Sequence, residues 1–320
     1  MTDVKQTPER TLKTILSEMA SKAEADQKLV SDAYEFAKTA HATHKRYSGE
    51  PYFVHAAEVG YQLSHAGMDA PAIAAGLLHD TIEDAGATEE IIKEKFTAEV
   101  LGLVDGVTKL GTLRYQGLER HAESLRKLFA ATAKDIRVLI IKLMDRLHNA
   151  QTLAHVPEQK RARIAHETLE IYAPIADRLG MSVVKSELED AAFPYAHPKE
   201  YDRVRIILKE RNRETEQRLE KTERGLKRAL AQAGVRVFRT ASRKKGIYSL
   251  FRKLDRKDWD INQIHDIIAL RVIVQSVADC YTVMGIVHGE WRPVPGKIKD
   301  YIASPKPNGY QSIHTPIYTG

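Results

Sequence analysis

The chain of 320 residues lacks the features that mark secreted, membrane and fibrous proteins. It contains one cysteine, Cys280, which excludes an internal disulfide framework and a metal cluster held by several thiolates. No apolar run approaches the roughly 20 residues that a helix needs to cross a bilayer. The first ten residues are polar and do not resemble a signal peptide. Together these absences predict a protein of the cytoplasm, where thiols stay reduced.

Aromatic residues are also few, at 7%, but hydrophobic residues (43%) and charged residues (29%) occur in ordinary globular proportions. A chain of this length can form two domains with separate cores. The net charge of +6 is unevenly placed, because residues 201–260 hold 19 Lys and Arg against 9 Asp and Glu, a net charge of +10. This local basic excess indicates an anionic partner for that segment.

The first part of the chain, residues 1–196, shows helical spacing of apolar residues, with glycines between the helical segments and no pattern typical of a strand. We expect helices over residues 29–41, 56–63, 70–78, 89–108, 122–131, 136–153 and 161–179. This part is therefore predicted to be an all-α domain.

In the second part, residues 197–320, the spacing of apolar residues changes. A long charged helix is expected over residues 199–233, ended by Gly234. Beyond it, strands are expected over residues 235–239, 267–274 and 313–318, with helices over residues 247–254 and 277–288. The alternation predicts an α/β domain built on a mixed sheet.

The most informative stretch is Leu77-Leu78-His79-Asp80-Thr81-Ile82-Glu83-Asp84. Glu83 follows His79 by four residues and Asp80 by three, so these side chains are expected on one face of a helix. Charged groups beside an apolar run cost free energy unless something neutralises them, and a bound cation would do so. Taken alone, however, a His-Asp doublet is weak evidence, because surface helices carry such pairs by chance.

Two further segments strengthen the metal hypothesis. His55 follows a turn rich in Gly and Pro, and Asp145 ends the apolar run 136–144, where a buried carboxylate needs a partner. The candidate ligands are His55, His79, Asp80 and Asp145. Imidazole and carboxylate without thiolate suit Mn(II), Fe(II) or Zn(II). Glu83 and Asp84 would then be free to orient or deprotonate a metal-bound water, as in a hydrolase. The other histidines of this part are expected to be packed or solvated, including His148, which adjoins Asp145 but lies outside the ligand set.

These residues together resemble the HD-superfamily hydrolase domain of the RelA/SpoT homologues, bifunctional enzymes that make and degrade the alarmone (p)ppGpp. Residues 46–52, 105–110, 135–137 and 142–149 also match family segments, as does the second half of the chain. The resemblance implies an all-α HD hydrolase domain over residues 1–196 and a nucleotidyltransferase-like synthetase domain over residues 197–320. It implies Mn(II) in the hydrolase site and hydrolysis of the 3′-diphosphate of (p)ppGpp to GDP or GTP and pyrophosphate.

The resemblance also implies residues that contact the nucleotide in the hydrolase site. These are Arg46, Ser48, Asn149 and Thr152. Tyr47 stands where the family often has Lys, and Gln151 stands where it often has Arg. Both departures remove a positive charge, so we expect an effect on nucleotide affinity or preference. The implied partners are the guanine nucleotides ppGpp, pppGpp, GDP and GTP.

A synthetase site is implied in the second half. Residues 242–253 concentrate cations at a turn entering a helix, where backbone N–H groups favour phosphate. By resemblance this is the ATP-phosphate motif, Asp266 holds Mg(II), and Tyr310 in the segment 297–314 stacks on guanine. The implied contacts are Arg243, Lys245, Ser249, Lys253, Lys306, Asn308, Tyr310 and His314. The implied reaction is pyrophosphoryl transfer from ATP to the 3′-OH of GDP or GTP.

Departures from the family pattern are greater in this half. Lys244 and Gly246 replace Pro and His of the family and loosen the phosphate-binding turn. The family's further acidic residue, on a strand reading roughly Glu-x-Gln-x-Arg, is not found among the 320 residues. We therefore expect little or no synthetase activity from this chain alone.

Three alternatives stay open. The first part could be an HD hydrolase of another nucleotide, given Tyr47 and Gln151. The basic segment could be an RNA- or ribosome-binding module, although it lacks interleaved aromatic residues for base stacking. The motifs could also be relics of ancestry. We expect no contact with membranes or DNA, and none with the ribosome, because the family's ribosome-contacting regions would lie beyond residue 320.

Overall fold

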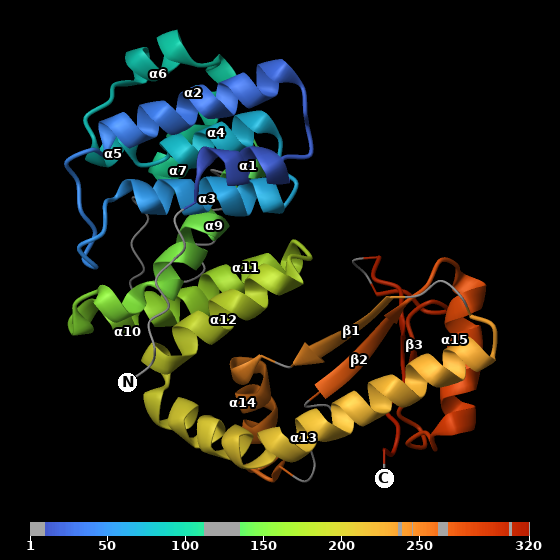
Figure 1. Cartoon of the computed structure of the whole chain (residues 1–320). Helices are drawn as coiled ribbons and strands as arrows, with labels where there is room; N and C mark the ends of the chain where they lie inside the picture. Colours follow the sequence, from blue (N-terminus) through green and yellow to red (C-terminus); the bar gives the residue numbers. More distant parts are fainter. Residues whose placement is uncertain are drawn as a thin grey trace. The chain divides into compact units, whose positions relative to one another are not determined.

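The computed structural model describes residues 10–111, 135–235, 239–244, 246–261, 268–306 and 309–319. The chain divides into two compact units, Met1–Ala196 and His197–Gly320, coloured from blue to yellow-green and from yellow to red in Figure 1. Each unit has its own cluster of buried apolar side chains. None of the described helices is long and apolar enough to span a membrane.

The first unit is built of helices throughout its described part, which confirms the all-α architecture expected from the sequence. These helices are α1 (Leu12–Glu18), α2 (Glu24–Ala40), α3 (Phe53–His65), α4 (Ala70–Leu78), α5 (Thr81–Asp84), α6 (Glu89–Lys95), α7 (Ala98–Gly111), α9 (Arg137–Gln151), the 3₁₀ turn η2 (Leu153–His155), α10 (Glu158–Glu167), the π-turn η3 (Thr168–Tyr172), α11 (Ala173–Arg178) and α12 (Ser182–Ala196).

The central helix of this unit is α4, which contacts α2, α3, α7 and α9. Its N-terminus is capped by Asp69, whose carboxylate accepts a hydrogen bond of 3.1 Å from the backbone N–H of Ala72. Every residue of α4 except Pro71 is buried, which explains why the helix carries no polar side chain. Its neighbours, by contrast, have one apolar and one polar face.

Glycines allow α3 and α4 to approach closely. A β-carbon on Gly60 of α3 would lie 2.7 Å from Leu77 of α4, and one on Gly76 of α4 would overlap the side chain of Leu63 of α3. The close approach fixes the end of α4 against α3. It thereby positions His79, which follows α4 directly.

Two of the helices predicted for this unit differ from the structure, and a third falls outside the described residues. The helix expected over residues 89–108 is two helices, α6 and α7, because Phe96 is extended and the Thr97 hydroxyl accepts the N–H of Val100 as a new N-cap. The helix expected over residues 161–179 is interrupted by the π-turn η3. The helix expected over residues 122–131 falls outside the described residues.

The second unit combines helices with short strands. Its described elements are α13 (Pro198–Gln232), β1 (Arg239–Lys244), α14 (Ile247–Asp255), β2 (Ile268–Ile273), α15 (Val277–Glu290), β3 (Lys299–Asp300) and β4 (Ile313–His314). The long helix α13 packs on α14, α15 and β2. Leu226, Leu230 and Val283 form the buried cluster between α13 and α15.

The strands of the second unit pair differently from the expectation. In the described residues β1 pairs with β2, from Arg239 opposite Ile273 to Lys244 opposite Ile268, and β3 pairs with β4; both pairs are antiparallel, so the expected mixed sheet is not found there. Val235 lies outside any strand, residues 236–238 of the expected strand fall outside the described residues, and β1 is described over Arg239–Lys244. The described side chains of β2, residues 269–273, alternate between exposed and half-buried. Apolar alternation located the strands only to within several residues.

Candidate functional site

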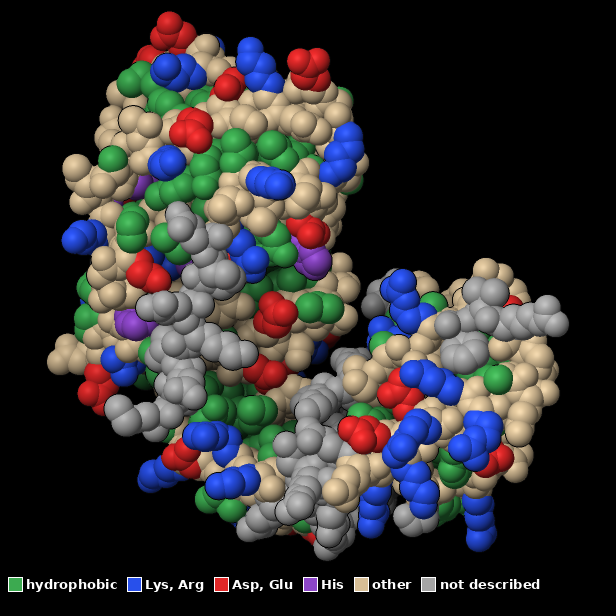
Figure 2. Space-filling model, in the orientation of Figure 1, with side chains coloured by type: hydrophobic (Ala, Val, Ile, Leu, Met, Phe, Trp, Pro, Cys, Tyr) green, Lys and Arg blue, Asp and Glu red, His purple; other side chains and the backbone are tan. Residues whose placement is uncertain are grey.

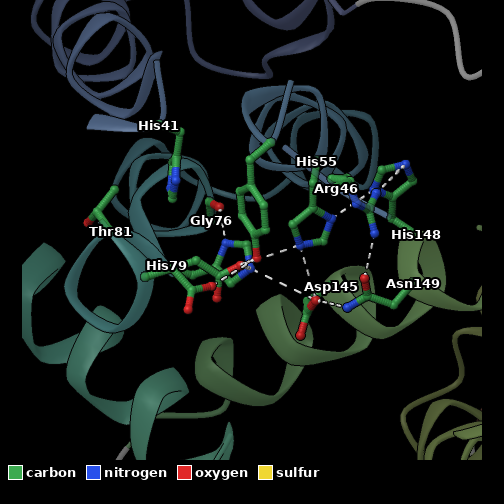
Figure 3. Close-up of polar contacts among 12 residues, drawn as sticks. His41, Arg46, His55, Gly76, His79, Thr81, Asp145, His148 and Asn149 are labelled. Carbon is green, nitrogen blue, oxygen red and sulfur yellow. Dashed lines mark hydrogen bonds and ion pairs between the residues drawn. The ribbon is translucent and has the colours of Figure 1, made fainter. Parts of the chain in front are cut away.

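Four side chains from three packed helices meet in the first unit. His55 lies in the first turn of α3, His79 caps the end of α4, Asp80 follows in the turn before α5, and Asp145 lies in the middle of α9. Helix α9 contacts both α3 and α4, and Figure 3 shows His55, His79 and Asp145 pointing toward one another. Both imidazoles are 1% exposed and Asp145 is 4% exposed, so the group is almost closed to solvent.

The backbone bends at the His-Asp doublet. Helix α4 ends at Leu78 and α5 begins at Thr81, so the prediction that His79, Asp80 and Glu83 share one helical face is wrong. Asp80 has φ −100° and ψ 0°, in the bridge region where many active-site residues lie. The Thr81 hydroxyl donates a hydrogen bond of 2.7 Å to the Leu78 carbonyl, which helps to end the helix there.

The four side chains place nitrogen and oxygen atoms around a common point. His79 Nε2 lies 3.0 Å from Asp80 Oδ2 and 3.9 Å from Asp145 Oδ1. His55 Nε2 lies 3.6 Å and 3.3 Å from the same two oxygens. Ligand atoms of His55, His79 and Asp80 lie within 4.8 Å of one another. Two imidazoles and two carboxylates therefore converge from positions as far apart as 55 and 145.

The His79 ring is oriented as a metal ligand. Its Nδ1 lies 2.8 Å from the carbonyl oxygen of Gly76, which can only accept, so Nδ1 carries the hydrogen and the neutral ring has its lone pair on Nε2. Nε2 is buried, and no hydrogen bond from the described part of the chain satisfies it. A buried nitrogen lone pair facing carboxylate oxygens requires a cation or a proton between them. The donor set fits a divalent metal ion.

The electrostatics of the group keep both carboxylates ionised. Burial would raise the pKa of Asp80, but the imidazoles of His79 and His55 hold it below its ordinary value. Burial would likewise raise the pKa of Asp145, but the Lys142 ammonium, 2.7 Å from Oδ2, and His55 hold it low. Burial lowers the pKa of His55, whereas Asp80 and Asp145 overcome the burial of His79 and raise its pKa to about 9. A metal ion would therefore displace a proton from His79.

Two exposed carboxylates follow the ligands on α5. Tyr52 donates its hydroxyl hydrogen to Asp80 Oδ2 at 2.6 Å, and the same hydroxyl lies 3.1 Å from Asp84 Oδ2. Partial burial and the negative charge of Asp80 raise the pKa of Glu83. Glu83 and Asp84 thus lie close enough to interact with the ligand group.

Three of the four predicted nucleotide contacts lie together beside Asp145. Arg46 donates from Nη2 to Asn149 Oδ1 at 2.8 Å and to Thr152 Oγ1 at 3.1 Å. Asn149 in turn donates to Asp145 Oδ1 at 2.5 Å. The fourth, Ser48, instead bonds within its own loop, where its hydroxyl donates to Glu50 at 3.0 Å. Arg46 therefore connects the loop before α3 to α9.

Tyr47, the first departure from the family pattern, is 65% exposed. Lys160 of α10 lies beside it, with Nζ 3.5 Å from the Tyr47 hydroxyl and 5.9 Å from the ring centre. The aromatic ring and Lys160 therefore border the same loop as Arg46. Gln151, the second departure, is exposed at the end of α9.

Three functional candidates in this group were not selected from the sequence. Tyr52 bonds to Asp80, Lys142 pairs with Asp145, and His148 Nδ1 lies 2.7 Å from His55 Nδ1. Burial, and then the nearby His55 and Arg46, lower the pKa of His148 to about 2, so its ring is neutral. Each of the three lies three residues from a predicted ligand. In the sequence, only that spacing could have indicated that these residues lie near the ligands.

Only part of the predicted synthetase site can be located. Lys306 lies over the rings of Tyr301 (4.7 Å) and Tyr310 (5.0 Å), and the Tyr310 hydroxyl is 3.0 Å from His314 Nε2. Ser249 and Lys253 lie one turn apart on α14, and the backbone of Arg243 is in β1. The predicted residues Lys245, Asp266 and Asn308 fall outside the described residues. Lys306, Tyr310 and His314 are therefore the predicted contacts that are seen to lie together.

Comparison with known proteins gives two family matches. The model of the HD domain matches residues 33–182, which include the four converging side chains. The model of a region found in RelA/SpoT proteins matches residues 242–320. The two matches lie one in each unit of the structure.

Curated relatives align with more than nine tenths of this chain. The chain is 47% identical over 310 residues to the guanosine-3′,5′-bis(diphosphate) 3′-pyrophosphohydrolase of Aquifex aeolicus, covering 97% of this chain and 44% of that protein. It is 46% identical over 296 residues to the GTP pyrophosphokinase of Myxococcus xanthus, covering 91% of this chain and 39% of that protein. The chain thus spans less than half the length of these curated relatives. A solved structure described as a metazoan orthologue of SpoT that hydrolyses ppGpp aligns with 56% of this chain and 99% of its own, at 25% identity and a TM-score of 0.42.

Proposed function

The chain belongs to the RelA/SpoT family, and from that premise we propose that its first unit hydrolyses the 3′-diphosphate of ppGpp and pppGpp, releasing pyrophosphate and GDP or GTP. One observation supports the reaction above all: the Nε2 atoms of His55 and His79 and the carboxylates of Asp80 and Asp145 face one point. The substrate is proposed from the names of the relatives. An HD domain of this kind acts with a divalent metal ion.

The proposed metal ligands are His55, His79, Asp80 and Asp145, and the proposed ion is Mn(II). Nitrogen and oxygen donors without thiolate suit that ion. When bound, the ion would polarise the phosphorus and lower the pKa of water. Lys142 would keep Asp145 ionised and oriented.

The remaining residues are proposed to bind the nucleotide and move a proton. Glu83 and Asp84 would orient the attacking water and accept its proton, and the Tyr52 hydroxyl would hold the Asp84 carboxylate beside Asp80. Four residues would contact the nucleotide: Arg46, Asn149 and Thr152, which lie together at α9, and Ser48 of the loop before α3. Arg46 is suited to this because a guanidinium offers several hydrogens in one plane.

A matched pair of histidines on α3 tests the assignment. His55→Ala removes a proposed ligand, whereas His65→Ala removes an exposed histidine at the other end of the same helix. We expect the wild type and His65→Ala to bind Mn(II) and release pyrophosphate from ppGpp, and His55→Ala to lose both. Pyrophosphate release by metal-free protein, or by His55→Ala at the wild-type rate, would refute the proposal.

The second candidate function is hydrolysis of a different nucleotide by the same metal site. Tyr47 places an aromatic ring and no charge at the edge of the Arg46 loop, with Lys160 beside it. Turnover of ppGpp, pppGpp, GTP and ATP, compared as kcat/KM, separates the two: ppGpp or pppGpp is expected to be preferred by at least about tenfold. Equal turnover of ordinary triphosphates would favour the second candidate.

For the second unit we propose the family's guanine nucleotide site, whose reaction would be pyrophosphoryl transfer from ATP in the presence of Mg(II); from this chain alone we expect little or none of that transfer. Lys306 between Tyr301 and Tyr310 gives a cationic and aromatic surface of the kind that binds a nucleotide base. The predicted contacts Arg243, Lys245, Ser249, Lys253, Asn308 and His314, and the Mg(II) ligand Asp266, complete the proposal. Retention of GDP by the wild type and its loss in Tyr310→Ala would test it.

Exposed basic residues on α13 favour an RNA-binding role for the second unit. Arg218, Lys221, Arg224 and Arg228 are exposed on α13 at spacings of three and four residues, which place them on one face. Figure 2 shows Lys and Arg side chains projecting from this region of the second unit. Filter binding at two salt concentrations tests the role, because binding driven by phosphate contacts weakens steeply with salt.

A further inference from the structure

His148 and His55 form a buried pair of imidazoles. Their Nδ1 atoms are 2.7 Å apart, their ring centres are 5.0 Å apart, and the ring planes are inclined by 13°. Each residue is 1% exposed. Two nitrogens at this distance must share one hydrogen, so one ring donates from Nδ1 and the other accepts.

The proposed ligand role of His55 decides which ring donates. A ring that binds a cation through Nε2 keeps its hydrogen on Nδ1, so Nδ1 of His55 is the donor and Nδ1 of His148 is the acceptor. Arg46 Nη1 lies at similar distances from both ring nitrogens of His148, 3.1 Å from Nδ1 and 3.5 Å from Nε2, and so lies over the ring rather than in line with one lone pair.

This hydrogen bond holds the other side of the His55 ring in place. Because Nδ1 of His55 carries the hydrogen, its Nε2 carries the lone pair, and Nε2 is the atom that faces Asp145 Oδ1 at 3.3 Å. Asp145 and His148 lie one turn apart on α9. One helix thus supplies both a proposed ligand and the acceptor that orients a ligand from another helix.

We propose that His148 is a positioning residue for the metal centre: its Nδ1 accepts the hydrogen of His55 Nδ1 and so presents the His55 Nε2 lone pair to the ion. The inference rests on the proposed metal site and extends it to a residue outside the ligand set. The same contact joins the centre to Arg46, which lies in the proposed nucleotide site. Loss of such an orienting partner typically costs about 10- to 100-fold in metal affinity.

Substitutions at position 148 separate hydrogen bonding from packing. In His148→Asn the side-chain oxygen can occupy the position of Nδ1, and in His148→Leu the volume is nearly kept but the acceptor is lost. His155→Leu, at an exposed histidine shortly after α9, is the control. Circular dichroism and thermal unfolding confirm that each variant folds.

Mn(II) affinity, measured by calorimetry on the full chain, is the readout. We expect a loss of about 10- to 100-fold for His148→Leu, recovery to within a few-fold of wild type for His148→Asn, and no change for His155→Leu. Wild-type affinity in a folded His148→Leu would overturn the role of His148 and leave the metal centre intact. Failure of the wild type to bind Mn(II) would overturn the metal centre, and this inference with it.

A measurement on the wild type avoids dependence on any variant. Two-dimensional NMR of ¹⁵N-labelled histidines in the Zn(II)-loaded protein shows which nitrogen of each ring is protonated. We expect His55 to carry its hydrogen on Nδ1 and His148 to carry its hydrogen on Nε2. A hydrogen on Nδ1 of His148 would overturn the proposal.

Discussion

The hydroxyl of Tyr52 lies 2.6 Å from Asp80 Oδ2, so a phenol donates directly to a carboxylate that faces both histidines of the centre. The same Tyr52 hydroxyl lies 3.1 Å from Asp84 Oδ2. Tyr52 precedes α3, whereas Asp80 lies in the turn after α4 and Asp84 ends α5. This single hydroxyl therefore holds the start of one helix to the acidic end of another.

Replacing Tyr52 by Phe should slow hydrolysis by about tenfold or more. Hydrogen bonds to charged groups contribute about 1.5–3 kcal/mol, and 1.4 kcal/mol corresponds to a factor of ten. Steady-state release of pyrophosphate from ppGpp measures the effect. Tyr61→Phe, elsewhere on α3, is the control and should keep wild-type activity. Equal rates for the two variants would exclude a role for the Tyr52 hydroxyl.

The affinity for Mn(II) should rise with pH. Asp80 and Asp145 overcome the burial of His79 and raise its pKa to about 9, so below that pH the ion must displace a proton. The apparent association constant should increase about tenfold per pH unit between about pH 7 and 8.5. Calorimetric titration in two buffers of different ionisation enthalpy also counts the released proton. A constant affinity over this range would contradict the prediction.

The metal-free protein should show the opposite trend in stability. The pKa of His79 rises from 6.5 to about 9 on folding, so its contribution is fully present below about pH 6.5 and is lost as the pH rises through about 9. The free energy of unfolding, measured with urea in the presence of a chelator, should therefore fall over this interval. His79→Gln should remove that part of the pH dependence.

Lys142→Met should destabilise the metal-free protein more than the metal-bound protein. Lys142 Nζ is 2.7 Å from Asp145 Oδ2, and removing one partner of a buried ion pair costs about 3–5 kcal/mol because the other charge stays buried. A bound cation would compensate that charge. Thermal unfolding with and without Mn(II) should therefore show a larger metal-induced rise in Tm for Lys142→Met than for wild type.

Gly76→Ala should destabilise the first unit by about 1–3 kcal/mol, because the added carbon would overlap Leu63 of α3 and the helices must separate. Gly102→Ala, within α7, meets no atom of the described residues within 4 Å and should instead stabilise by up to about 1 kcal/mol. Urea unfolding of both variants measures the difference. If both substitutions have the same sign, close packing of α3 and α4 does not explain the glycine at position 76.

The sequence alone predicted the helical character of the first unit and the family. Both predictions rest on local features, namely the spacing of apolar residues and the residue types of the ligands. It did not reveal His148 or Tyr52 as part of the centre. The hydrogen bond between His148 and His55 joins residues 93 positions apart, and only the packing of α3 on α9 brings them together. The strand expected over residues 313–318 forms a strand only at Ile313–His314, because an alternating run does not by itself fix where pairing begins and ends.

The bend at His79 and Asp80 has a mechanical consequence. In an unbroken α-helix, neighbouring residues project about 100° apart, so two in succession could not grip one ion. Because the helix is interrupted here, His79 belongs to the end of α4, whereas Asp80 begins the short segment that carries Glu83 and Asp84. A displacement of α5 would therefore move the three acids together relative to the His79 imidazole, which is held by α4.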